Sequence, residues 1–265
     1  VPERHGRWRA LAAGEFILRH PDEDSDVDRR RRLPDAPGGP LGRNGTYMVW
    51  RKLRQDVALW RRTIRAAAAR YHDGDERKLA AKVVGRWQDG TPIVSHPDAP
   101  DPAFDAAAPG ANDFRYGEDL DGRRCPLGAH IRRSNPRDAL GNGGKLSLRH
   151  RMIRRGMPYG PPLRAGELTD DGVDRGLVFV SFQASIFRQF EGVQTPWIND
   201  GDIFGLGADK DYLLGDPAGS GKMTIQGSKP FFLAPQETFV VTRGGEYLLV
   251  PGIAALQAIA DGAAG

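Results

Sequence analysis

The chain has 265 residues, 39% of them hydrophobic and 27% charged, as expected for a folded protein with one large or two small domains. Its 38 basic and 34 acidic residues make a mixed surface with a net charge of +4, which argues against a nucleic-acid-binding protein. The single cysteine, Cys125, excludes an intramolecular disulfide framework and any multi-cysteine metal site, and no apolar run is long enough to span a membrane.

Residues 1–44 are rich in charge, proline and glycine, and they predict a leading segment that lies across another surface. The segment contains one apolar patch, Phe16–Leu18, and a basic run, Arg29–Arg32, which is typical of a solvated loop. The chain begins with Val1 rather than methionine, so we expect a processed or partial product. Residues 45–265 are expected to form the domain.

The first regular elements follow Asn44. Residues 46–54 are rich in β-branched and aromatic side chains and predict a strand. Asp56 opens a segment in which apolar residues recur at steps of three and four until Gly74, which predicts a helix with one buried face. A second, shorter helix is expected over residues 76–86.

Residues 87–144 lose this periodicity, and so long an irregular stretch in a compact domain indicates a functional insertion. Within it, His130 stands among small and apolar residues and is followed by Arg132, Asn135 and Arg137. An imidazole can bind a metal through one nitrogen while a hydrogen bond fixes the other, and guanidinium groups bind carboxylates. Iron porphyrin requires both, although an isolated histidine is more often an ordinary polar residue.

Regular structure returns in the second half. The pattern predicts strands over 146–155, 177–182, 238–242 and 247–250 with a turn or bulge at 243–246, and helices over 185–194 and 253–260. Without its insertions, this order is the β-α-β-β-α-β motif of an α+β, ferredoxin-like antiparallel sheet. Two helices would cover one face, and the other face would bury against a cofactor or a second domain.

Five collinear stretches resemble the dye-decolourising peroxidase superfamily, specifically its C-terminal half. They are residues 45–56, 125–137, 153–160, 176–194 and 242–252. The resemblance implies a haem b peroxidase built from two ferredoxin-like halves with the cofactor between them. Hydrogen peroxide would be the oxidant, and phenolic, dye-like or other bulky aromatic compounds the reducing substrates.

The resemblance also implies roles for particular residues. His130 would be the proximal iron ligand, and Arg154 the distal arginine that stabilises charge on the departing peroxide oxygen. On the propionate side, contacts are expected from Arg132, Asn135 and Arg137. Phe179 and Phe182, with Leu177, would form the walls of the pocket. Glu191 would be the carboxylate behind His130, with Asp200 and Asp202 beyond it. The alternatives are a surface basic pair at Arg154–Arg155, core packing for the phenylalanines and a solvent-facing Glu191. His150, in a basic stretch, is a weaker rival ligand.

One family feature is missing. The motif Gly-x-x-Asp-Gly, which carries the presumed acid–base aspartate, does not occur, since the segments 85–90 and 117–122 each have one residue too many. We therefore expect a companion chain or missing N-terminal half to complete the fold. Two alternatives to the peroxidase stay open: a haem-binding or haem-handling protein without efficient turnover, and a structural half-domain without haem.

Overall fold

The computed structural model describes residues 10–24, 36–141, 144–216, 218, 222–234 and 236–262. Its centre is a four-stranded antiparallel sheet in the order β2-β3-β1-β6. The strands are β1 (Thr46–Gln55), β2 (Ile153–Tyr159), β3 (Gly176–Gln183) and β6 (Val240–Val250). With the first and third strands in the middle, this order is the ferredoxin-like arrangement that the sequence predicts, and the α+β fold class is confirmed.

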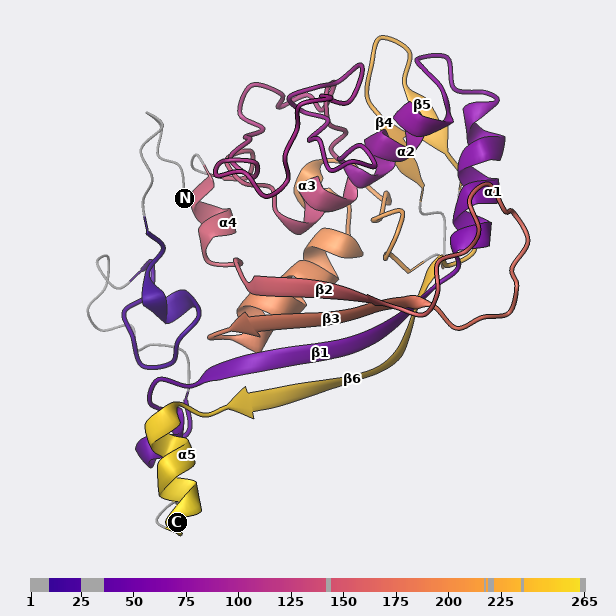
Figure 1. Cartoon of the computed structure of the whole chain (residues 1–265). Helices are drawn as coiled ribbons and strands as arrows, with labels where there is room; N and C mark the ends of the chain where they lie inside the picture. The colour runs from indigo at the N-terminus through magenta and orange to yellow at the C-terminus, as the bar shows by residue number, and fades with distance from the viewer. Residues whose placement is uncertain are drawn as a thin grey trace.

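The strand register assigns each side chain to one of two faces. Leu53 lies opposite Leu177 and Arg51 opposite Phe179, and these side chains share the covered face. On the other face Trp50 lies opposite Val180. In Figure 1 a helical segment passes behind β2 and β3, and no helix crosses in front of these strands. We call the uncovered side the open face.

Helices α1 (Val57–Ala68) and α2 (Glu76–Val84) form within the two segments that the sequence predicts to be helical, and each begins after an aspartate that accepts a backbone N–H. Asp56 Oδ1 accepts from Leu59 N at 2.8 Å, and Asp75 Oδ1 from Lys78 N at 2.9 Å. The two helices pack with the irregular insertion and a hairpin, β4 (Met223–Ile225) and β5 (Phe231–Leu233), into the main hydrophobic core. Residues 196–237, where the sequence pattern predicts neither a strand nor a helix, therefore contain a hairpin.

Two π-helical segments follow β3. These are η4 (Ile186–Glu191), which packs on β1 and β3, and η5 (Val193–Ile198), which packs on the short helix α3 (His130–Ser134). The single helix predicted over 185–194 is thus two segments that extend to residue 198. π-Helical turns are rare and occur frequently at functional sites.

The strand predicted over 146–155 is wrong in its first half, where α4 (Lys145–Leu148) and a turn precede β2. Ser147 Oγ bonds to Gly144 O at 2.9 Å, and His150 Nδ1 to Leu146 O at 2.8 Å, so local side-chain bonds close turns here. At the end of the domain, α5 (Ile253–Ala260) follows β6 as predicted and packs against η2 (Gly39–Gly42). Two further short 3-10 turns are η1 (Ala13–Glu15) and η6 (Asp202–Phe204).

The expected bulge lies in β6, where pairing with β1 shifts between Lys52 and Leu53 and leaves Arg243 as the extra residue. Within the described part of the chain, no helix has the length and hydropathy required to cross a bilayer.

Candidate functional site

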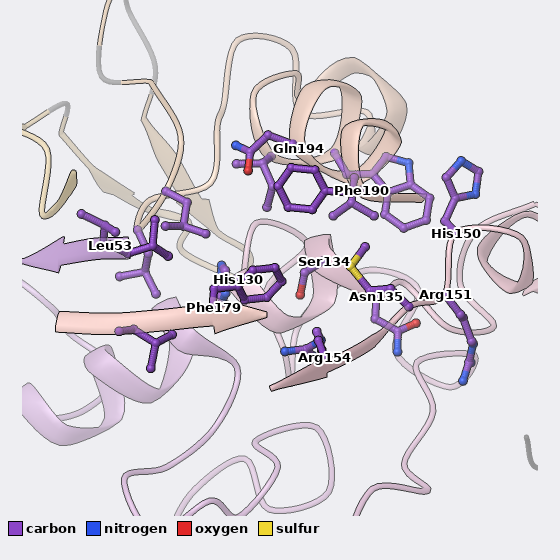
Figure 2. A pocket seen from close by; sticks show the side chains of 18 of the residues that line it. Leu53, His130, Ser134, Asn135, His150, Arg151, Arg154, Phe179, Phe190 and Gln194 are labelled. Atoms are coloured by element: carbon purple, nitrogen blue, oxygen red, sulfur yellow. The ribbon is translucent and has the colours of Figure 1, made fainter. Parts of the chain in front are cut away.

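A cavity of about 290 Å³, here called the central pocket, lies between the covered face of the sheet and the helices α3, η4 and η5. Leu53, Leu177 and Val240 line it at the sheet. Figure 2 shows His150, Arg151 and Asn135 gathered at one end of the pocket and Leu53 at the other. Apolar side chains thus make up most of the lining, here called the body of the pocket, and a group of polar side chains gathers at one end, here called the polar end.

His130 lines this pocket as the first residue of α3, and its ring is held by a buried carboxylate. His130 Nδ1 lies 2.9 Å from Oδ2 of Asp211, whose side chain is fully buried. The other oxygen, Oδ1, accepts the backbone N–H groups of Leu213 and Leu214 at 2.9 and 2.8 Å. An ionised carboxylate can only accept, so Nδ1 donates and Nε2 is left available to the pocket.

Several contacts keep Asp211 ionised. Burial raises the pKa of its carboxyl, but the charge of His130, the hydrogen bond from its ring and the Leu214 N–H outweigh that effect. The nearby guanidinium of Arg133 acts in the same direction, and the net pKa lies below its ordinary value. At neutral pH, His130 thus has a negatively charged partner on the side away from the pocket.

This arrangement corrects the partner predicted for His130, because the carboxylate at Nδ1 is Asp211 and not Glu191. Glu191 Oε1 instead accepts from Tyr247 Oη at 3.1 Å, at the end of η4. Asp200 and Asp202 do not reach the histidine either, because Asp200 Oδ1 caps its own turn by accepting the Asp202 N–H. The sequence offers one local signal for Asp211. Aspartate in a loop often accepts the backbone N–H groups of residues two and three positions later, as Asp211 does here.

Arg132 does not line the pocket, contrary to the prediction. It lies two positions after His130 in α3, on a different side of the helix, whereas Ser134 at four positions shares the side of His130. Its Nη1 pairs with Asp119 Oδ2 at 3.0 Å and also donates to Cys125 O, and the guanidinium stacks on Tyr116. Arg132 is therefore part of a buried network beneath the helix.

Of the other two predicted propionate contacts, Asn135 lines the pocket and Arg137 does not. Arg137 Nη1 donates to Asn112 O and Phe114 O at 2.7 and 3.0 Å, and so ties down the irregular insertion. Its backbone has a φ of 55°, which turns the chain away from α3.

Arg154 and Phe179 both line the pocket from the covered face of the sheet, and their roles as distal arginine and haem-pocket wall stay predictions. Arg154 has no ion pair or hydrogen-bond partner within the residues that the structure describes. Desolvation by the surrounding protein lowers the pKa of its guanidinium, which nevertheless stays protonated near neutral pH. The prediction that Phe182 is a pocket wall is wrong, because the alternation along β3 directs this side chain to the open face, opposite Met48.

The polar end of the pocket contains Arg151, which the sequence analysis did not single out, and His150, which it considered only as a rival iron ligand. His150 stacks on Trp197 with ring centroids 4.6 Å apart, and burial lowers the pKa of its imidazole. Periodicity could not identify them, because they follow α4 in a turn and not in the predicted strand.

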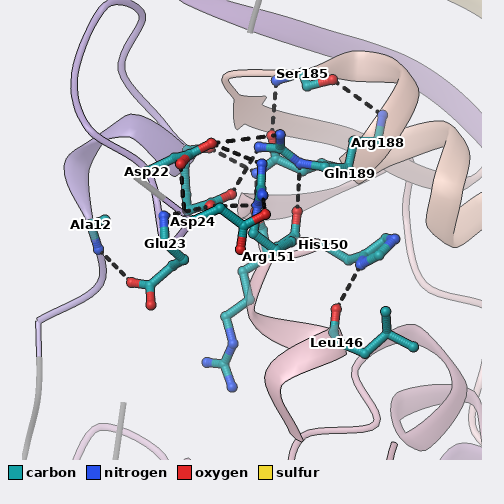
Figure 3. Close-up of polar contacts among 12 residues, drawn as sticks. Ala12, Asp22, Glu23, Asp24, Leu146, His150, Arg151, Ser185, Arg188 and Gln189 are labelled. Atoms are coloured by element: carbon teal, nitrogen blue, oxygen red, sulfur yellow. Dashed lines mark hydrogen bonds and ion pairs between the residues drawn. The ribbon is translucent and has the colours of Figure 1, made fainter. Parts of the chain in front are cut away.

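A cluster of buried ion pairs stabilises the turn that carries His150 and Arg151. The side chain of Glu15 is fully buried and contacts Arg149 Nε at 3.1 Å and Arg188 Nη2 at 3.0 Å. Asp22 and Asp24 approach the same arginines, while Gln189 bonds to the carbonyl oxygens of both Glu15 and Arg151 (Figure 3). Residues 10–24 thereby join the start of η4 to the turn that carries His150.

None of the described residues that line the central pocket is a carboxylate. The two near-matches to the absent motif are engaged elsewhere, since Asp89 Oδ1 accepts the Thr91 N–H and Asp121 is exposed. The pocket also lies under the covered face, within this chain, whereas the sequence led us to expect the cofactor between two halves. The open face is a separate surface.

Comparison with known proteins gives a consistent result. A family model described as Dyp-type peroxidase, C-terminal, matches residues 22–203. The multifunctional dye peroxidase DyP2 of an Amycolatopsis species is 34% identical over 260 residues, which cover 85% of this chain and 51% of the relative. A dye-decolorizing peroxidase of Mycena epipterygia is 32% identical over 255 residues, which cover 82% of this chain and 47% of that relative. The chain thus spans about half the length of these curated relatives.

Solved structures show the same likeness. An ancestral D-type dye decolorizing peroxidase superposes with a TM-score of 0.74 at 30% identity, covering 92% of this chain and 55% of that one. A dye-decolorizing peroxidase in complex with 2,6-dimethoxyphenol gives a TM-score of 0.72 at 29% identity, and the match covers 95% of this chain and 59% of that one.

Proposed function

Because the chain belongs to the Dyp-type peroxidase family, through its C-terminal domain, we propose that it is the haem-binding half of a haem b peroxidase. The enzyme would use hydrogen peroxide to oxidise phenolic, dye-like or other bulky aromatic reducing substrates. One observation carries the proposal. His130, paired with a buried carboxylate, and Arg154, a cation without a partner among the described residues, line the same pocket from different elements.

The donor chemistry of the pocket fits haem. The apolar body suits a porphyrin ring, and the polar end suits its propionates, which Arg151 and Asn135 would hold, with His150 beside them. Nε2 of His130 is the nitrogen available to the iron. When bound, haem supplies the iron at which peroxide is reduced and through which electrons from the reducing substrate return.

The residues of this chain then have separate tasks. Asp211 accepts the Nδ1 proton of His130, which fixes the ring orientation and makes Nε2 more electron-rich. Arg154 carries a positive charge at neutral pH, which would stabilise the negative charge that develops on the departing oxygen of peroxide. Leu177 and Phe179 keep that side of the pocket apolar, which strengthens the electrostatic effect of Arg154.

The open face supports the proposal that a second half completes the protein. Ile153, Met157 and Leu248 expose 53, 49 and 40% of their surfaces there, beside Val180 and Phe182. Contiguous apolar patches of this kind mark interaction surfaces in soluble proteins. We propose that a companion chain or N-terminal half covers this face. Because the described lining of the pocket contains no carboxylate and the pocket lies on the other side of the sheet, a segment of that half would pass the sheet edge to supply the acid–base aspartate.

The same missing carboxylate favours one alternative, a haem-binding or haem-handling protein without efficient peroxidase turnover. Titration of the purified chain with haemin separates the possibilities. A Soret band that is lost in His130→Ala and kept in His72→Ala, an exposed histidine remote from the pocket, is expected for both haem proteins. A chain that never acquires the band would refute both and leave the structural half-domain.

Turnover is the second arm of this experiment. Co-expression with the N-terminal half of a full-length relative should produce rapid peroxide-dependent oxidation of 2,6-dimethoxyphenol. If the completed, haem-loaded protein oxidises this phenol no faster than free haemin does, the peroxidase proposal is wrong and the haem-handling alternative stands.

A further inference from the structure

A second hollow, here called the side groove, opens next to the central pocket. It has a volume of about 580 Å³, and its walls include Arg51, Phe187, Phe190, Glu191 and Tyr247. Three residues, His150, Phe190 and Gln194, line both the side groove and the central pocket. Figure 2 shows these three side chains at the pocket, with Phe190 and Gln194 contributed by the helical segment above it. A molecule in the side groove would therefore lie one side chain away from the pocket.

The groove presents aromatic surface to solvent. The Phe187 side chain is 81% exposed and that of Tyr247 is 48% exposed, although large aromatic residues normally bury most of their area. Rings also connect the groove with the pocket, since Phe190 lies 6.0 Å from Tyr247 and 6.1 Å from Phe179, centroid to centroid. These surfaces suit a planar aromatic ligand.

The charges of the groove select among aromatic ligands. The guanidinium of Arg51 lies over the Phe190 ring, 4.6 Å from its centroid, and hydrogen-bonds to the Tyr247 hydroxyl, but it forms no ion pair with any described carboxylate. Glu191 is occupied by the Tyr247 hydroxyl at 3.1 Å, and Arg188 is held by Glu15 at 3.0 Å. Among the described residues that line the groove, Arg51 is the arginine without a carboxylate partner, and guanidinium groups bind sulfonates and carboxylates well.

We propose that the side groove is a binding site for anionic aromatic substrates, such as sulfonated phenols, with the ring against Phe187 and Tyr247 and the anion on Arg51. As a substrate site, it rests on the proposed peroxidase function. It gives molecules too large for the central pocket a defined position beside its Phe190 wall.

Calorimetric titration of the chain with 6-hydroxynaphthalene-2-sulfonate, compared with uncharged 2-naphthol, tests the proposal without requiring haem or turnover. The sulfonate should bind about tenfold more tightly than 2-naphthol, and Arg51→Gln should abolish that difference. Phe187→Ala should weaken both ligands by a similar factor. Because Phe187 is exposed, this variant tests the groove without disturbing the core.

Two matched variants serve as controls. Lys52→Gln removes the neighbouring cation, which the strand alternation directs to the open face, and Phe232→Ala removes another exposed phenylalanine, on β5. Both should bind the two ligands as the wild type does. Equal affinity for the sulfonate and 2-naphthol in the wild type, or Arg51→Gln and Phe187→Ala variants that bind like it, would overturn the proposal.

The proposed function can fail separately. Binding that depends on Arg51 and Phe187 in a chain that acquires no Soret band would leave an anionic aromatic site and remove its role in peroxidase turnover. A haem-loaded, peroxidase-active protein that does not bind the sulfonate in this way would leave the proposed function standing and refute the substrate site in the side groove. In the active protein, 6-hydroxynaphthalene-2-sulfonate should have a higher KM after Arg51→Gln, with kcat changed less than KM.

Discussion

Nδ1 of His130 and Oδ2 of Asp211 lie 2.9 Å apart although 81 residues separate them in the chain. The contact joins the irregular insertion to the loop after η5 and fixes the orientation of the His130 imidazole in the central pocket. A carboxylate on the remote nitrogen of a ligating histidine changes the electron density at the metal, so this pair governs the chemistry proposed for the pocket.

Replacing Asp211 by Asn should weaken that effect without removing the ligand. We expect the haem-loaded variant to keep a Soret band, to have a higher iron reduction potential and to lose about 10–100-fold in peroxidase rate. Redox titration and stopped-flow kinetics measure the two effects. Glu191→Gln, at the carboxylate that the sequence predicted for this role, should leave the potential unchanged, and a shift of equal size in both variants would argue against the assignment of Asp211.

Arg154→Leu should affect the peroxide step selectively. In the completed protein, we expect the rate of reaction with hydrogen peroxide to fall by about 10²–10³-fold while the haem absorption remains. Arg155→Leu is the matched control, because Arg155 is the next residue of β2 and lies opposite Val180 on the open face. Similar rate losses in both variants would show that the effect is not specific to the pocket.

Arg132 and Arg151 should show opposite phenotypes. Arg132→Ala leaves Asp119 buried without its partner, so the free energy of unfolding should fall by about 3–5 kcal/mol. Arg151→Ala should instead weaken haem affinity, because Arg151 lies at the polar end of the pocket. Urea denaturation and haem transfer measure the two properties, and weaker haem binding in Arg132→Ala with unchanged stability would restore the propionate role first predicted for it.

Glu15 predicts a pH dependence of stability. Burial raises the pKa of this carboxyl above its ordinary 4.5, and the opposing effects of Arg188 and Arg149 are smaller. Because the folded-state pKa is the higher one, the protonated form favours folding, and this contribution is lost as the pH rises through the folded-state value. Relative to Glu15→Gln, the wild type should therefore lose free energy of unfolding between pH 4.5 and neutral pH.

Urea denaturation at a series of pH values checks this expectation. Glu118→Gln, at an exposed carboxylate, should remain parallel to the wild type throughout. If the wild type gains stability over Glu15→Gln as the pH rises, the ion pairs with Arg149 and Arg188 outweigh burial and the sign is wrong.

The open face predicts how the chain behaves without its companion. Sedimentation should show self-association of the wild type through this apolar surface, and Phe182→Asp should reduce it, because Phe182 lies on that face. Haem affinity should not change, since the pocket is on the other side of the sheet. A stable, haem-loaded wild-type monomer would contradict the role of the face as an interface.

The fold was largely predictable because its strands and longer helices follow clear periodicities. The same periodicities also show why the predictions for Phe182 and Arg132 were wrong. Alternation along β3 separates Phe182 from Phe179, and helical spacing separates Arg132 from His130. These errors arose because residues were assigned by likeness to a motif before their directions on the element were considered.

Other features depend on contacts that the sequence does not indicate. The segment 146–152 alternates like a strand, but hydrogen bonds of Ser147 and His150 to nearby carbonyls, and the pairing of Arg149 with Glu15, hold it in a helical turn. Asp211 reaches His130 only because the loop after η5 folds back on α3. Such long-range pairings are set by tertiary packing and not by local pattern.

The position of β1 in the sheet has a consequence for how the protein forms. This strand is made first, yet it pairs with β3 and β6, whose residues end at 183 and 250. Pairings so distant along the chain close slowly and cannot form until the later strand has left the ribosome. The sheet floor beneath the central pocket is therefore completed only after β6 has been made, and the segment up to β3 cannot form the whole wall of the pocket by itself.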